Sequence, residues 1–75
     1  MKDNQLEQLI LMVNQIVDNN IYNGNDEEVI EITRNHLSLF WARSMKKSII
    51  DYANSDGKEL NELAIKSVEL LSKYS

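Results

Sequence analysis

Apolar residues recur at every third or fourth position through most of this sequence, and no other feature restricts its fold as much. The clearest run contains Leu6, Leu9, Ile10, Val13, Ile16 and Val17. Because an α-helix turns once every ~3.6 residues, this spacing gathers the side chains on one helix face. No stretch alternates apolar and polar residues for long, as a half-exposed strand would. The sequence therefore predicts an all-α fold.

Two helices can be delimited in the first half of the chain. The first is expected over residues 3–20, with Asp3 as its N-cap, and an Asn- and Gly-containing loop follows it. The second begins at Asn25 or Asp26. With Asn25 as the cap, Glu28 occupies the third helical position, as in a capping box. The apolar stripe of this helix is expected to contain Val29, Thr33, His36, Leu37 and Phe40.

The course of the chain after Phe40 admits two interpretations. A separate third helix over residues 42–54 is the preferred one. In the alternative, the second helix continues to residue 54, and one continuous stripe then contains Leu37, Trp41, Met45, Ile49 and Tyr52 or Ala53. Gly57 breaks the chain, and a last helix is expected over residues 61–73. Its predicted inward residues are Leu60, Leu63, Ala64, Val68 and Leu71. We expect a single domain, residues 1–75, folded as a compact bundle of three to four short helices.

The chain is short and has no covalent or metal support of the usual kinds. It has 75 residues, no cysteine and one histidine. A core of this size rarely supplies more than ~3–5 kcal/mol, and small proteins usually add disulfides, a structural metal or a partner. Disulfides and thiolate metal sites are excluded, and one histidine cannot build a multi-histidine zinc site. Composition therefore favours a protein partner.

Charge and hydropathy exclude two further classes of partner. The formal net charge is −4, whereas binding to phosphate backbones depends on concentrated Lys and Arg. The longest apolar run, residues 9–13, is far shorter than the ~18–20 residues that span a bilayer. The N-terminus does not have the pattern of a signal peptide. We expect a cytoplasmic protein that binds neither nucleic acid nor a membrane.

No set of residues predicts catalysis. Glu27, Glu28 and Glu31 cluster at a helix start, where they complement the helix dipole, and no Glu-x-x-His pair accompanies them. His36 has no acidic or nucleophilic partner at helical spacing, and a packed or interface histidine is the preferred interpretation. Gly24 and Gly57 fit no phosphate-binding loop. We expect no catalytic, cofactor-binding or metal-binding residues.

Two features suggest a binding surface. Phe40 and Trp41 are adjacent and project ~100° apart on a helix, so both cannot point into one small core. Our preference is that Trp41, with Met45 below it, lies at a helix junction or reaches the surface; a helix bend that buries both rings is the other interpretation. Arg43, Lys46 and Lys47 beside Trp41 form either a solvated helix face or, in the alternative function, the face of a small regulatory or nucleic-acid-binding protein.

Three segments carry a family resemblance. The first is Met12-Val13-Asn14-Gln15-Ile16 followed by Asp18-Asn19, and the second is His36-Leu37, Phe40-Trp41 and Met45. The third combines Gly57 and Leu60 with Ala64, Val68 and Leu71. Taken together, they resemble the delta-subunit family of NAD-dependent formate dehydrogenases over nearly the whole chain. The chain departs from the family pattern at Ala42-Arg43, where members typically carry Asp-Pro, and this weakens the prediction of a sharp break after Trp41.

The resemblance implies a small accessory subunit of a cytosolic, molybdenum- or tungsten-containing, NAD-dependent formate dehydrogenase. Such a subunit holds no cofactor, binds the large catalytic (alpha) subunit, and stabilises the complex or assists its assembly. Self-association of the isolated chain stays open. We expect His36, Phe40, Trp41 and Met45 to organise the partner-binding surface, with Asn14 and Gln15 as polar contacts. Replacing Trp41 by Ala is then expected to weaken complex formation more than it unfolds the chain.

Overall fold

A computed structural model describes residues 4–74 as four α-helices joined by short connections. They are α1 (Asn4–Asn20), α2 (Asp26–Phe40), α3 (Arg43–Ser55) and α4 (Glu62–Tyr74). No strand occurs in this range, so the predicted all-α class and the number of helices are confirmed. The expected N-cap, Asp3, lies outside the described residues.

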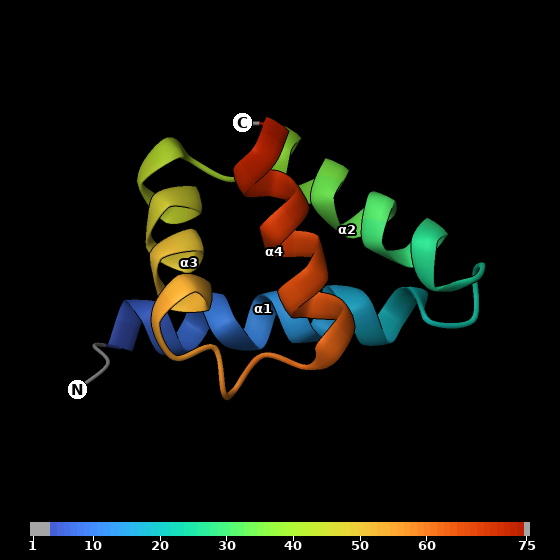
Figure 1. Ribbon diagram of the computed structural model, residues 1–75, viewed down its shortest axis with the longest axis horizontal. Helices are drawn as coiled ribbons and strands as arrows, with labels where there is room; N and C mark the ends of the chain where they lie inside the picture. Colours follow the sequence, from blue (N-terminus) through green and yellow to red (C-terminus); the bar gives the residue numbers. More distant parts are fainter. Residues whose placement is uncertain (1–3, 75) are drawn as a thin grey trace.

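α1 crosses the other three helices, and α4 lies between α2 and α3 (Figure 1). The most extensive helix contact joins α2 to α4, whereas α2 and α3 make little contact with each other. The last residues of α2 lie on the opposite side of the view from α1 (Figure 1). α2 and α3 therefore meet mainly at the corner where the chain passes from one into the other.

The core is one cluster of buried side chains drawn from every helix. α1 contributes Leu9, Ile10, Val13 and Val17, as its periodicity predicted. The other buried apolar residues are Val29, Leu37, Trp41, Ile49, Tyr52, Leu60, Ala64, Val68 and Leu71. Of the inward residues predicted for the last helix, Leu63 is half-buried and the others are buried. Two polar side chains, Thr33 and Ser67, are also buried.

The start of α2 is fixed by the predicted capping box. The Asn25 side chain accepts a hydrogen bond from the Glu28 backbone N–H at 2.9 Å, and the Glu28 carboxylate accepts one from the Asn25 N–H at 3.2 Å. Gly24 leaves room for this arrangement, because a Cβ there would lie 2.9 Å from the Glu28 side chain. The acidic first turn, Asp26-Glu27-Glu28, complements the positive end of the helix dipole.

The chain breaks after Phe40, as the preferred interpretation expected. Trp41 is the C-cap of α2 with φ −91° and ψ 141°, and Ala42 is the N-cap of α3 with φ −65° and ψ 155°. Ala42 has no side-chain hydrogen bond to the helix that it begins. The continuous-helix alternative is therefore wrong. Several residues of the stripe predicted for a continuous helix are nevertheless in the core. Leu37, Trp41 and Ile49 are buried, and Met45 packs against the core cluster.

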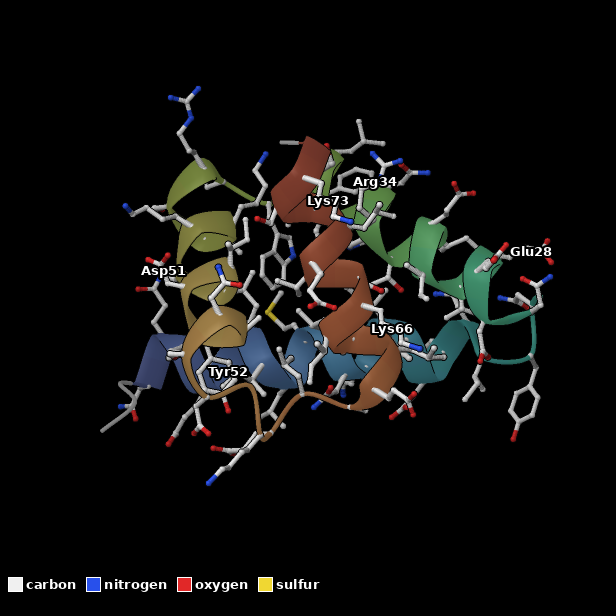
Figure 2. All side chains as sticks on the ribbon, in the orientation of Figure 1. Glu28, Arg34, Asp51, Tyr52, Lys66 and Lys73 are labelled. Atoms are coloured by element: carbon white, nitrogen blue, oxygen red, sulfur yellow. The ribbon has the colours of Figure 1, made fainter. Side chains whose placement is uncertain are left out.

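The connection from α3 to α4 is held by side chains from two other segments. The N–H groups of residues 56 and 57 both donate to the Tyr52 carbonyl at 3.1 Å, and Gly57, with φ +64°, then turns the chain out of the helix. The Tyr52 hydroxyl accepts a hydrogen bond from the Glu59 N–H at 3.0 Å, and Figure 2 shows Tyr52 at the end of α3 beside this loop. Asn14 of α1 then donates from Nδ2 to the Glu59 carbonyl at 2.8 Å.

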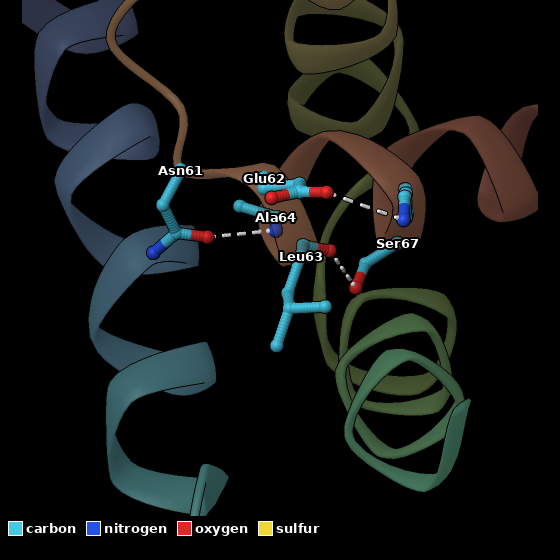
Figure 3. Close-up of polar contacts among 6 residues, drawn as sticks. Asn61, Glu62, Leu63, Ala64 and Ser67 are labelled. Carbon is cyan, nitrogen blue, oxygen red and sulfur yellow. Dashed lines mark hydrogen bonds and ion pairs between the residues drawn. The ribbon is translucent and has the colours of Figure 1, made fainter. Parts of the chain in front are cut away.

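Asn61 caps the first turn of α4, and Asn14 binds the backbone of Asn61. Asn61 accepts a hydrogen bond at its side-chain oxygen from the Ala64 N–H at 2.8 Å (Figure 3). The Asn61 N–H itself donates to Asn14 Oδ1 at 2.9 Å. One turn later the buried Ser67 hydroxyl donates to the Leu63 carbonyl at 2.7 Å (Figure 3). Asn14 thus links α1 to the helix start that lies 47 residues away in sequence.

None of the helices within residues 4–74 is both long enough and apolar enough to cross a membrane.

Candidate partner-binding surface

α2 presents two parallel rows of side chains that have different environments. The buried row is Val29, Thr33 and Leu37, and the buried Trp41 continues its four-residue spacing. The neighbouring row, one residue earlier, contains Ile32, His36 and Phe40, which are all exposed. Rows at i, i+4 spacing are the ridges by which helices pack, so only one of the two rows faces α4.

His36 and Phe40 were expected on the inward stripe, and this expectation was wrong. Both side chains lie on the exposed row, and Phe40 retains 71% of its surface. The other three residues of the expected stripe, Val29, Thr33 and Leu37, are buried as predicted, and His36 and Phe40 lie one residue off that row. The two rings contact each other, with centroids 4.9 Å apart and planes tilted by 45°. His36 therefore packs on its helix neighbour rather than in the core.

Trp41 lies at the helix junction, as expected, but its ring is buried. It is 6% exposed and belongs to the core cluster, against which the half-buried Met45 packs. Because the backbone turns at Trp41, its ring points inward while the ring of Phe40 points outward. The prediction that the two rings cannot share the core is confirmed. Of the two positions expected for Trp41, the helix junction is the observed one, and the ring that reaches the surface is that of Phe40.

Asn14 and Gln15 have different roles in the structure. The side-chain nitrogen and oxygen of Asn14 both bind the backbone of the loop before α4, so these atoms stabilise the fold. Gln15 is exposed on α1. Since α1 and the last turn of α2 lie on opposite sides of the molecule, the structure does not bring Gln15 together with His36 and Phe40 (Figure 1).

One surface residue was missed by the sequence analysis. Leu39, next to Phe40, is 76% exposed, the largest value among the exposed aliphatic side chains. Its signal was available, since residues 32, 36 and 39 share one helix face at three- and four-residue spacing. We call the set Ile32, His36, Leu39 and Phe40 the corner surface. Contiguous exposed apolar groups of this kind mark interaction sites on soluble proteins.

A basic pocket adjoins the corner surface. It is an open hollow lined by Ser38 at the end of α2 and by Arg43, Lys46, Lys47 and Ile50 on α3. The Lys46 ammonium donates to the Ser38 carbonyl at 3.3 Å, where a cation complements the C-terminal end of α2. The three cations that were noted in the sequence are thus gathered in one hollow, next to Leu39 and Phe40 in the chain.

The three carboxylates that were considered for catalysis lie at the start of α2 and form no cluster suited to catalysis. Glu28 forms the capping box at the start of α2, where Figure 2 places it, and Glu27 and Glu31 are exposed nearby. Within residues 4–74 no three His, Cys, Asp or Glu side chains are grouped so that they could hold a metal ion. The features that remain as a candidate site are the corner surface and the basic pocket.

Comparison with known protein families decides the family. The sequence model described as the NADH-dependent formate dehydrogenase delta subunit FdsD matches residues 8–68 of the chain, which is well over half of its length. The chain belongs to this family. A search of curated proteins and a search of solved structures found no significant match.

The match gives the helices of this delta subunit a biological setting. Residues 8–68 include most of α1, all of α2 and α3, and the first half of α4, together with the corner surface and the basic pocket. The chain is a subunit of a formate dehydrogenase complex, and the other subunits of that complex are its partners. The resemblance that the sequence carried at His36, Phe40 and Trp41 is thereby confirmed at the level of the family.

Proposed function

We propose that this delta subunit is a non-catalytic accessory subunit that docks on the large catalytic subunit of a cytosolic, molybdenum- or tungsten-containing, NAD-dependent formate dehydrogenase. Docking stabilises the complex or assists its assembly, and the delta subunit itself holds no cofactor. The observation that supports this proposal best is the corner surface, on a chain that belongs to a family of complex subunits. Its two most exposed residues, Leu39 and Phe40, are 76% and 71% exposed.

The side chains of this surface are suited to protein contact. Aromatic residues are enriched at protein interfaces and among the residues that dominate their energetics. Phe40 is held by its contact with His36 and by the end of α2, so it loses little freedom when a partner covers it. His36, Phe40 and the half-buried Met45 retain the docking role expected for them, while Trp41 supports that surface from beneath.

The test is a binding measurement on the complex with single substitutions. The delta subunit is co-expressed with the other formate dehydrogenase subunits, and its affinity for the delta-free enzyme is measured by titration. Truncating an interface hot spot costs ~2 kcal/mol or more, which corresponds to about 30-fold in affinity. Phe40→Ala is expected to weaken binding by about this factor, with an unchanged melting curve of the isolated chain.

A matched control is available on α1. Leu11 is also exposed, at 58%, and lies on α1 rather than at the corner. Leu11→Ala is expected to leave the affinity unchanged. Equal losses for both variants would place the interface elsewhere, and a wild-type delta subunit that fails to bind any formate dehydrogenase subunit would refute the proposal.

An order-of-addition experiment separates stabilisation from assembly. Formate dehydrogenase is expressed without the delta subunit, and purified delta subunit is added afterwards. A stabilising role predicts that late addition lengthens the half-life of formate oxidation activity on heating. An assembly role predicts that only co-expression restores activity, because late addition reaches an enzyme that is already incomplete.

A further inference from the structure

The basic pocket has no internal counter-charge. None of Arg43, Lys46 and Lys47 forms an ion pair within the described part of the chain, and no acidic side chain lines the pocket. By contrast, Lys66 on α4 pairs with Glu62 at 3.5 Å. Arg43 and Lys47 are exposed, and Lys46 is half-buried and held above the pocket by the Ser38 carbonyl. The chain concentrates three cations here although its net charge is −4.

The helix end beside the pocket makes the local field more positive. The first N–H groups of any α-helix lack intrahelical acceptors and form the positive end of its dipole. Ala42 supplies no side-chain acceptor to α3, and no acidic residue lies in its first turn. α2 has the opposite arrangement, with an Asn25 cap and three acidic residues in its first turn. An anion from outside the chain would satisfy both the three cations and the uncapped helix start.

We propose that this pocket binds an acidic segment of the formate dehydrogenase subunit on which the delta subunit docks. An aspartate or glutamate of that segment lies among Arg43, Lys46 and Lys47, and apolar residues beside it cover Leu39 and Phe40. This inference rests on the proposed function and adds to it the chemical character of the partner. Exposed apolar side chains beside unpaired cations favour a protein segment as the ligand, because a phosphate group has no apolar part that could cover Leu39 and Phe40.

Two other occupants are outcomes of the test. Nucleic acid binding requires more cations than three, and the rest of this acidic chain would repel a phosphate backbone. A second copy could offer the acidic start of α2, where Glu27, Glu28 and Glu31 line another hollow. That contact would join different faces of two copies, so it would give rings or filaments rather than a two-fold dimer.

The first experiment is carbodiimide coupling of the purified delta-containing formate dehydrogenase complex. The reagent joins a lysine amine to a carboxylate in contact with it, and mass spectrometry of the digest identifies both peptides. We expect Lys46 or Lys47 to be coupled to an aspartate or glutamate of another formate dehydrogenase subunit. Lys58, which is exposed in the loop before α4, serves as an internal control and should not be coupled to another subunit. Coupling of Lys46 or Lys47 to a second delta subunit, or equal coupling of Lys58 to another subunit, would overturn the inference.

The second experiment is charge reversal. The variant Arg43→Glu/Lys47→Glu is compared with Lys58→Glu/Lys66→Glu, which changes the net charge by the same amount at exposed positions that do not line the pocket. Circular dichroism first establishes that both variants keep the wild-type melting curve. Reversal at the pocket is expected to lower affinity for the delta-free enzyme about tenfold or more and to flatten or reverse its dependence on salt.

The outcomes separate this inference from the proposed function. If both charge variants bind as the wild type does while Phe40→Ala binds weakly, the acidic-segment proposal is wrong and the accessory-subunit proposal stands. If the wild-type chain binds no formate dehydrogenase subunit but binds double-stranded DNA with a steep salt dependence that requires Arg43 and Lys47, both proposals are wrong.

Discussion

The two connections that flank α3 are built in opposite ways. The one that follows it is bonded to the rest of the fold: Tyr52 and Asn14 bind the backbone of Glu59, and Asn14 also binds that of Asn61. The one that precedes it consists of Trp41 and Ala42 and offers no side-chain cap to α3. The corner surface and the unpaired cations of the basic pocket lie beside the connection that precedes α3.

This difference separates the groups that fold the chain from those available to a partner. In a small protein most buried polar groups must find partners inside the chain, and the connection after α3 meets that requirement. At the connection before α3, only the Trp41 ring is committed to the core. Substitutions on the two sides should therefore affect stability and binding in different proportions.

The largest expected effect on stability concerns the adjacent rings at the α2–α3 corner. Trp41→Ala removes a ring that is 6% exposed and should cost ~3–5 kcal/mol of unfolding free energy. A core of this size supplies about that much in total, so the variant should be largely unfolded. Phe40→Ala should change stability by less than ~0.5 kcal/mol, as exposed substitutions do. Urea unfolding followed by circular dichroism measures both.

Trp41→Phe keeps this comparison informative if the alanine variant does not fold. It retains an aromatic ring in the core and should lose less stability than Trp41→Ala while binding the partner normally once folded. A Trp41→Ala chain that keeps its urea midpoint but loses partner binding would instead support the original expectation that Trp41 is a docking residue.

A smaller effect is expected on the bonded side of the comparison. Asn14→Ala removes both hydrogen bonds that α1 makes to the loop before α4, and each such bond contributes ~0.5–1.5 kcal/mol. Gln15→Ala, at the exposed neighbouring position, is the matched control and should be within ~0.5 kcal/mol of the wild type. Amide hydrogen exchange should show faster exchange at residues 59–64 in the Asn14 variant. Equal stability of the two variants would mean that the loop does not depend on Asn14.

How far the sequence predicted this structure depends on the range of the interactions concerned. The helices, the capping box and the turn at Gly57 follow from residues within a few positions of each other. The stripe predicted for α2 was right at Val29, Thr33 and Leu37, which are buried. It was wrong at His36 and Phe40, because helical spacing alone does not distinguish the buried row from the exposed row one residue earlier. Which member of the Phe40-Trp41 pair is buried depends on where the backbone turns.

Contacts across the fold had no local signal. Asn14 meets residues 45 and 47 positions away, and nothing in its own helix distinguishes it from the exposed Gln15. The basic pocket was visible only as a group of nearby cations. Its concave shape arises because α2 and α3 diverge from the corner and make little contact with each other.

One substitution is expected to raise stability, and it lies in the connection between α2 and α3. Ala42→Asp places a side-chain acceptor and a negative charge at the uncapped start of α3. Replacing Ala by a capping residue at an N-cap stabilises a helix by ~0.5–2 kcal/mol, and the nearby cations add to this gain. We expect a higher melting temperature for the isolated chain.

Ala42→Asp should also weaken docking, because the new carboxylate neutralises part of the positive potential that attracts the partner's acidic segment. Ala42→Ser is the matched control: it caps α3 without a charge, so it should raise stability and leave affinity nearly unchanged. Titration of both variants against the delta-free enzyme gives the comparison. A more stable Ala42→Asp chain that binds more weakly than Ala42→Ser would show that the uncapped start of α3 contributes to partner binding and not to stability. Equal binding of the two variants would mean that the positive end of α3 plays no part in docking, and the affinity would then reside in the apolar corner surface alone.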